Sequence, residues 1–169
     1  MLVSDNKLKY GVALLLCIGT GIAVLKLGGW FNPRLQAIQA PALSGERIHI
    51  PDQRGRLTWV SSWSVSCALC LRELPDLEAL HLQYGKHLQI VALALPADPP
   101  NAINDVKNRL QLTLPVVLDL DAAAARQLTP DLVVPSHHLV DSEGRVLLKL
   151  KGALHREAML AALQPYLPP

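Results

Sequence analysis

The order of apolar and polar residues predicts alternating strands and helices over most of the chain. Residues 57–60 form an alternating apolar run typical of a buried strand, and residues 88–95 form a continuous apolar run broken only by Gln89, as in a strand covered on both faces. Between them, apolar side chains recur at spacings of three and four, which predicts a helix that ends at about Gly85: Leu74, Leu77, Leu80 and Tyr84. A glycine directly after such a stretch is typical of a helix C-terminus.

The remaining pattern predicts a layered α/β domain. Further strands are expected at 46–50, 115–120, 136–141 and 146–150, and further helices at 101–110, 121–128 and 155–164. Asn101 is expected to cap the first of these helices, and Pro165 is expected to end the last one. The resulting order, β-β-α-β-α-β-α-β-β-α, is typical of a central sheet covered on both sides.

An apolar segment near the N-terminus, uncharged from residue 10 to residue 25, predicts a membrane anchor. Residues 10–31 reach about the twenty residues that a bilayer requires. Two lysines precede the segment and one lies near its end, which favours a cytoplasmic position for residues 1–9 and an extracytoplasmic one for the rest. Residues 32–42 are expected to form a linker, and residues 43–169 the folded domain. A cleaved signal peptide is the main alternative. A buried soluble helix is disfavoured because the segment has no polar face.

Composition and charge narrow the classes of function. Half of the residues are hydrophobic but only 4% are aromatic, so the core must consist mainly of aliphatic side chains. The net charge of +2 comes from the lysines around the N-terminal segment, and the rest of the chain is balanced, with no basic cluster. Nucleic-acid binding therefore has no support.

Two cysteines at the predicted start of the long helix carry the main chemical signal. Cys67 and Cys70 follow a predicted strand in a C-x-x-C spacing. A thiolate at Cys67 would be stabilised by the partial positive charge and unpaired amides of the helix N-terminus. Residues at i and i+3 lie about 5–6 Å apart between Cβ atoms, so a disulfide can form and open with little backbone movement. The pattern favours thiol–disulfide chemistry, for which an exported domain is a suitable setting.

Two other roles for these cysteines stay open. A structural disulfide between them would close a very short loop and would stabilise the fold little. A zinc site needs four ligands, and the sequence has no second Cys/His pair at zinc spacing. The third cysteine, Cys17, lies in the apolar N-terminal segment, where it is expected to act as a small hydrophobic residue.

With these residues in place, the chain resembles the TlpA/ResA-type membrane-anchored thiol–disulfide oxidoreductases of the thioredoxin-like superfamily. Two motifs carry the resemblance, in order and at suitable spacing: WVSSWSVSCALCLRELP, which holds the cysteines, and VVPSHHLVDSEGRV, which is followed by Gly152. The resemblance covers roughly residues 43–169. It implies a thioredoxin-like fold, with a central mixed β-sheet flanked by helices and preceded by one N-terminal transmembrane helix.

The resemblance also implies catalytic roles. Cys67 would be the exposed attacking thiol and Cys70 the buried resolving thiol. Pro135 would be a cis-proline whose loop, which includes Val134, faces the disulfide and receives the substrate backbone. Glu73 would lie close to the active site and would accept or relay a proton, whereas its position on the predicted helix alone indicates an exposed carboxylate.

Two further residues are expected at the substrate. Trp63 matches the family's tryptophan ahead of the C-x-x-C motif, and packing in the core is its alternative role. Leu69 is expected to present an apolar contact to a partner.

The sequence departs from the family pattern at several positions. Ser66 stands where the family commonly has a second tryptophan, and Ser61 stands where cytoplasmic thioredoxins carry a buried aspartate. His137 and His138 replace small and aromatic residues beside Pro135. Neighbouring residues on a strand point to opposite faces, so at most one of these histidines would face the cysteines.

The function implied by the resemblance is an enzyme that reduces disulfides of a specific exported protein, as in cytochrome c maturation. It would sit in the cell inner membrane with its domain in the periplasm, and a membrane electron-transfer protein would be its redox partner. No cofactor beyond the Cys67–Cys70 disulfide is expected, and no metal. The motif does not fix the direction of electron flow, because reductants and oxidants share it. The alternative is a copper or other metal chaperone that uses His137 or His138, or a non-catalytic thioredoxin-fold binding protein.

Overall fold

A five-stranded mixed sheet forms the centre of the domain. The computed structural model describes residues 34–167, which belong to a compact unit that begins at Arg34. The sheet has the order β5-β4-β3-β6-β7, with β3, β4 and β5 parallel to one another and β6 and β7 paired antiparallel. The strands are β3 (Leu57–Trp63), β4 (Leu88–Ala94), β5 (Val116–Leu118), β6 (Ser136–Val140) and β7 (Val146–Lys151).

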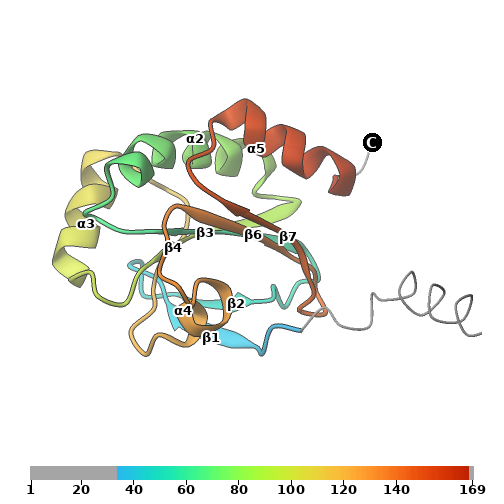
Figure 1. Cartoon of the computed structure of the whole chain (residues 1–169), viewed down its shortest axis with the longest axis horizontal. Coiled ribbons are helices and arrows are strands. Elements are labelled where there is room, and N and C mark those ends of the chain that lie inside the picture. Colours follow the sequence, from blue (N-terminus) through green and yellow to red (C-terminus); the bar gives the residue numbers. More distant parts are fainter. Residues whose placement is uncertain (1–33, 168–169) are drawn as a thin grey trace, which may run out of the picture. The chain divides into compact units, whose positions relative to one another are not determined.

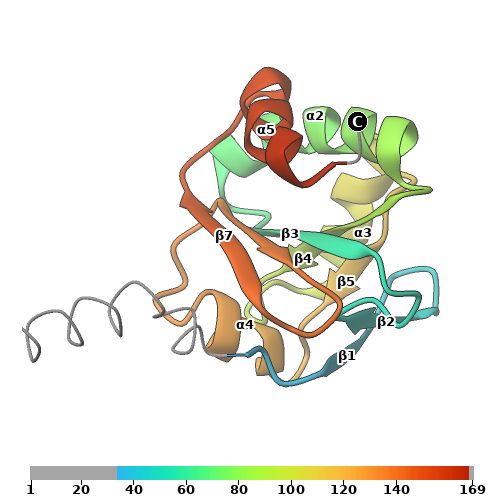
Figure 2. The same cartoon turned by 90° about the vertical axis from the view of Figure 1, so that its right-hand side faces the viewer.

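Helices cover both faces of this sheet. The helices are α2 (Ala68–Tyr84), α3 (Pro100–Arg109), α4 (Ala123–Leu128) and α5 (Arg156–Leu163), and α5 continues into the short 3-10 helix η2 (Gln164–Tyr166). Side chains of α2, α3 and α5 pack into one core cluster, and side chains of α4 pack into the other. Figures 1 and 2 show α2 and α5 on one side of the sheet and α4 on the opposite side. The predicted α/β layers are therefore confirmed.

Alternation along the central strands explains why two cores form. On β3, Trp59 and Trp63 belong to the core under α2, whereas Val60 belongs to the core on the α4 side. Every residue of β4 is buried, as its almost entirely apolar sequence predicts, and Gln89 is its one polar residue. Both clusters are dominated by aliphatic side chains, in agreement with the composition.

The folded unit starts earlier than residue 43. The segment 32–42, expected to be a linker, contains strand β1 (Ile38–Pro41), which pairs antiparallel with β2 (Arg47–Ile50). Ile38 is 3% exposed and packs in the core on the α4 side. The strand expected at 46–50 is thus present, and it belongs to a small separate sheet.

The predicted elements differ from the observed ones mainly at their ends. Strand β3 runs to Trp63, three residues beyond the expected 57–60. Helix α3 has Pro99 as its N-cap and Pro100 in its first turn, so the prediction that Asn101 caps it is wrong. A proline suits the first turn because an amide hydrogen at that position has no partner within the helix.

The expected anchor at 10–31 and the preceding residues 1–9 lie outside the described residues. Within residues 34–167, no helix is long and apolar enough to cross a membrane.

Candidate active site around Cys67 and Cys70

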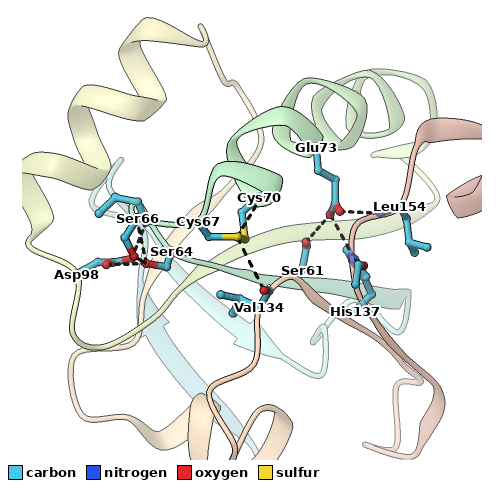
Figure 3. Close-up of a disulfide and its surroundings, with 12 residues drawn as sticks. Ser61, Ser64, Ser66, Cys67, Cys70, Glu73, Asp98, Val134, His137 and Leu154 are labelled. Atoms are coloured by element: carbon cyan, nitrogen blue, oxygen red, sulfur yellow. Dashed lines mark hydrogen bonds and ion pairs between the residues drawn. A yellow bond between two sulfur atoms is a disulfide. The ribbon is translucent and has the colours of Figure 1, made fainter.

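The redox pair lies where the central strand passes into the long helix. Strand β3 ends at Trp63, a three-residue loop follows, and Cys67 is the N-cap of α2. Cys67 and Cys70 form a disulfide with Cα atoms 5.2 Å apart. The Cys70 amide also donates a hydrogen bond of 3.1 Å to Cys67 Sγ, so the sulfur occupies the place of an N-cap acceptor (Figure 3). The same amide would stabilise negative charge on this sulfur once the disulfide is reduced.

The two sulfur-bearing residues differ in accessibility. Cys67 is partly exposed, whereas Cys70 is 2% exposed and belongs to the core beneath α2. Only the first cysteine is therefore open to another molecule.

A proline loop faces the exposed sulfur. The Val134–Pro135 peptide bond is cis. The carbonyl oxygen of Val134 lies 3.8 Å from Cys67 Sγ, as Figure 3 shows. The Gly152 amide donates a hydrogen bond of 2.9 Å to the Pro135 carbonyl, and this bond attaches the loop to the end of β7. The structure thus places Cys67, Val134 and Pro135 together.

Glu73 is buried one turn beyond Cys70, so the sequence-based indication of an exposed carboxylate is wrong. Its side chain receives two hydrogen bonds and one histidine contact from three different segments of the chain (Figure 3). The Leu154 amide donates to Oε2 at 2.8 Å, Ser61 Oγ donates to Oε1 at 3.3 Å, and His137 Nε2 lies 3.3 Å from Oε1. An acceptor-only group is in this way satisfied inside the core.

The partners of His137 define its tautomer. His137 Nε2 lies 3.3 Å from Glu73 Oε1 and 3.2 Å from the Gly152 carbonyl oxygen. A carbonyl oxygen only accepts, so Nε2 carries the hydrogen. The ring is fully buried, and its centroid lies 5.6 Å from that of Trp59. His137 is therefore a hydrogen-bond donor held on the same side of the sheet as α2.

His138 points to the opposite face. It follows His137 on β6 and is 2% exposed. Burial, together with the smaller effect of the positive charge of Lys149, lowers the pKa of His138 from 6.5 to about 4. The two histidines thus have separate surroundings, as the alternation of a strand predicts. Among residues 34–167, no three His, Cys, Asp or Glu side chains gather as a metal-binding group.

The residues expected at the substrate differ in exposure. Leu69 is 47% exposed and lies between the two cysteines, and Leu132 and Val133 are similarly exposed just before the proline loop. Trp63 is 1% exposed and packs in the core, which disagrees with its expected contact to substrate and agrees with its alternative role.

Sequence reasoning missed two parts of this site. Asp98, which lies between the strand expected at 88–95 and the helix expected at 101–110, accepts hydrogen bonds from the segment just before Cys67. The contact of His137 with Glu73 depends on the pairing of β6 with β3, in which His137 lies opposite Ser61. The residue pattern alone carries no signal for either contact, because both join segments that are distant in sequence.

A cavity of about 330 Å³ lies away from the cysteines. It is lined by β2, by the residues just before β3 and by the end of α2, at the opposite end of β3 from Cys67. Arg56 and Asp52 in its wall bond to each other at 2.6 Å. The cavity therefore has no part in the chemistry at the disulfide.

The fold and the site together define a thioredoxin-like protein with an accessible dithiol–disulfide pair, and comparisons with known proteins agree. The profile of the AhpC/TSA family matches residues 33–149, and the chain belongs to this family. The thiol-disulfide oxidoreductase ResA of Bacillus cereus is 24% identical over 175 residues, which cover 98% of this chain and 100% of that protein. ResA of Geobacillus kaustophilus is 27% identical over 68% of this chain and 66% of its own length.

Solved structures show the same fold. StoA from Bacillus subtilis superimposes with a TM-score of 0.67 at 21% identity, over 74% of this chain and 94% of that one. The exposed lipoprotein thioredoxin Etrx1 from Streptococcus pneumoniae gives a TM-score of 0.69 at 18% identity, over 77% of this chain and 99% of that one. With the Cys67–Cys70 pair in place, the chain is a thiol–disulfide oxidoreductase with a thioredoxin-like fold.

Proposed function

We propose that this oxidoreductase is anchored in the cytoplasmic membrane by residues 10–31 and reduces disulfides of a specific exported protein in the periplasm, as in cytochrome c maturation. The observation that carries the redox part is the placement of a partly exposed Cys67 sulfur at a helix N-terminus, against a cis-proline loop and in front of a buried Cys70. The anchor is supported by the apolar character of residues 10–31, which hold Lys26 as their one charged residue, and by the similarity to ResA, which spans 98% of this chain.

In the proposed reaction, the reduced pair transfers two electrons to the substrate. The Cys67 thiolate attacks one sulfur of the substrate disulfide, so that a mixed disulfide forms as the substrate S–S bond breaks. The first substrate sulfur leaves as a thiolate and takes up a proton. The Cys70 thiolate then attacks Cys67 Sγ, which releases the second substrate sulfur and closes the Cys67–Cys70 disulfide. A membrane electron-transfer protein would restore the dithiol by the reverse exchange.

Glu73 would assist the second attack. Cys70 is buried, so its thiol has no direct access to water for loss of its proton. Glu73 lies one helical turn further along α2, and its carboxylate would accept that proton. The hydrogen bonds from Ser61 and Leu154 and the contact with His137 would hold the carboxylate in place during this transfer.

The substrate would bind over the proline loop. Val134 and Pro135 lie beside the Cys67 sulfur, where they would receive the substrate backbone, and the exposed Leu69 would contact an apolar side chain. Trp63 would support this surface from within the core rather than touch the substrate.

The reduction potential of the full chain in detergent tests the direction of transfer. Equilibration with glutathione or dithiothreitol buffers is expected to give a value near or below about −270 mV, which is typical of a thioredoxin-like reductant. A value near about −120 mV would make the protein a disulfide donor and would refute the reductase proposal. Absence of any reversible couple would refute the redox proposal as a whole.

Metal delivery has no comparable support. His137 is bonded to Glu73 and Gly152, and His138 lies on the other side of the sheet. Neither imidazole therefore faces a position where a metal ion could also bind the two cysteine sulfurs.

A further inference from the structure

The loop that carries Cys67 lies beside the loop after β4. Strands β3 and β4 are parallel and in register at their ends, where Trp63 lies opposite Ala94. The Leu95 amide donates a hydrogen bond of 2.9 Å to the Trp63 carbonyl. The two chains therefore leave the sheet side by side, and Asp98 follows Leu95 closely enough to reach residues 64–66.

Asp98 binds this loop with both carboxylate oxygens. The Val65 amide donates to Oδ2 at 2.9 Å, and Ser64 Oγ lies 3.0 Å from Oδ1 (Figure 3). Ser64 has one hydroxyl hydrogen, and the carboxylate only accepts, so Ser64 donates to Asp98. Ser66 Oγ, at 2.9 Å, must then donate to Ser64 Oγ.

Hydrogen bonds from backbone amides link Ser66 and Cys67 to Ser64. The Ser66 amide lies 3.3 Å from Ser64 Oγ, and the Cys67 amide donates to the Ser64 carbonyl at 3.1 Å. Ser64 itself is 6% exposed. Every residue between β3 and α2 is therefore fixed to Asp98 either directly or through Ser64. Among the described residues, Asp98 is the only charged side chain with a hydrogen bond to residues 64–66.

The charge of Asp98 lies at the same helix end as the attacking sulfur. In the disulfide, Cys67 carries no charge, but in the reduced pair its thiolate and the Asp98 carboxylate both occupy the N-terminal side of α2. Like charges near one another disfavour ionisation of either group. The carboxylate therefore raises the free energy of the reduced, ionised state and leaves the disulfide unaffected.

We propose that Asp98 is a positioning residue that fixes the Cys67 loop and, through its charge, shifts the dithiol–disulfide equilibrium of the pair toward the disulfide. Reduced Cys67 and Cys70 then give up two electrons and two protons more readily, to a substrate disulfide or to glutathione disulfide. This inference rests on the redox activity of the pair under the proposed function, and is independent of the substrate and of the anchor.

The test compares the full chain in detergent with four variants. Asp98→Asn removes the charge and retains a carbonyl acceptor, and Asp105→Asn removes a charge from an exposed position on α3 as the matched control. Ser64→Ala removes one hydrogen bond of the loop without a change in charge. Asp98→Glu keeps the charge on a longer side chain. The reduced fraction is measured at fixed ratios of reduced to oxidised glutathione, and the Cys67 thiol pKa is measured from the pH dependence of alkylation.

Asp98→Asn is expected to shift the glutathione equilibrium toward the dithiol about fivefold and to lower the Cys67 thiol pKa by more than about half a unit. Asp105→Asn and Ser64→Ala are expected to leave the thiol pKa unchanged. Equal results for Asp98→Asn and Asp105→Asn would overturn the role of the charge, as would a pKa shift of the same size in Ser64→Ala. If Asp98→Asn does not fold, the Asp98→Glu variant provides the test. A dithiol–disulfide equilibrium constant with glutathione within about twofold of that of the parent supports the proposal, and a larger shift toward the dithiol contradicts it.

The two proposals fail in different ways. A parent chain that shows no reversible exchange with glutathione would refute the proposed function. A reversible couple that does not respond to Asp98→Asn would refute this inference alone.

Discussion

Replacement of His138 by leucine should make the domain more resistant to mild acid. His138 lies in β6 and is 2% exposed. Its pKa is lowered from 6.5 to about 4, mainly by burial and to a smaller extent by Lys149, His137 and Lys151, and the Leu128 backbone acts in the opposite direction. In the unfolded chain the same imidazole regains a pKa near 6.5. Leucine is similar in size and does not titrate.

The sign and size of the effect follow from this difference. Above about pH 6.5, His138 is neutral in both the folded and the unfolded chain, so it does not reduce the free energy of unfolding. As the pH falls from about 6.5 toward 4, only the unfolded chain takes up the proton, and the free energy of unfolding decreases. Between about pH 7.5 and pH 5, the loss for this one group is about 2 kcal/mol.

Urea unfolding of the parent chain and the His138→Leu variant at the two pH values measures this difference, with the fluorescence of the buried Trp59 and Trp63 as the signal. All other titrating groups are common to both proteins, so they cancel in the comparison. The free energy of unfolding should fall by about 2 kcal/mol more in the parent than in the variant. Equal losses in the two proteins would refute a lowered pKa for His138.

Three further predictions concern the site. Glu73→Ala should lower the free energy of unfolding of the oxidised chain by about 2–4 kcal/mol in urea, because the part-buried Leu154 amide and the buried Ser61 hydroxyl lose their acceptor. Glu73→Gln should cost roughly half as much, and a loss below about 0.5 kcal/mol for Glu73→Ala would contradict the hydrogen-bond network around Glu73. Cys70→Ser should accumulate a mixed disulfide with glutathione that non-reducing mass spectrometry detects, whereas Cys67→Ser should not; the opposite pattern would reverse the assigned roles. Gly152→Ala should destabilise the chain by about 1–2 kcal/mol in the same urea assay, because residue 152 has φ +96°, which side-chain-bearing residues rarely adopt. No atom lies within 4 Å of an added Cβ, so this cost comes from the backbone alone. An unchanged urea midpoint would show that the backbone relaxes at this residue.

Much of the fold could be predicted because its signals are local. The helix after Cys67 carries its own periodicity and ends at Gly85, and β4 is apolar at nearly every position. Strand β1 was missed because four residues that include Pro41 form a strand only through pairing with β2, whose position is not encoded within the segment itself. Burial of that strand depends on α4, which lies far away in the sequence.

In the candidate site as well, the parts marked by sequence motifs could be predicted, and the parts that depend on long-range contacts could not. The disulfide and the cis-proline loop were expected from motifs and resemblance, and the structure brings Cys67 and Val134 together. The environment of Glu73 could not be derived, because it depends on the register of β3 with β6 and on the return of the chain at Leu154. A charged residue on a helix is usually solvated, and only long-range pairing supplies the contacts with Ser61, Leu154 and His137 that allow Glu73 to be buried.

The bond from the Leu154 amide to Glu73 has a practical consequence for spectroscopy. A backbone amide proton is observed directly by NMR, and this one points at a carboxylate oxygen 2.8 Å away. Its chemical shift responds to the charge on that oxygen, so the resonance of Leu154 follows the proton on Glu73 without any label at the active site. The Leu154 amide, in the connection between β7 and α5, thereby reports on protonation of Glu73 beside Cys70.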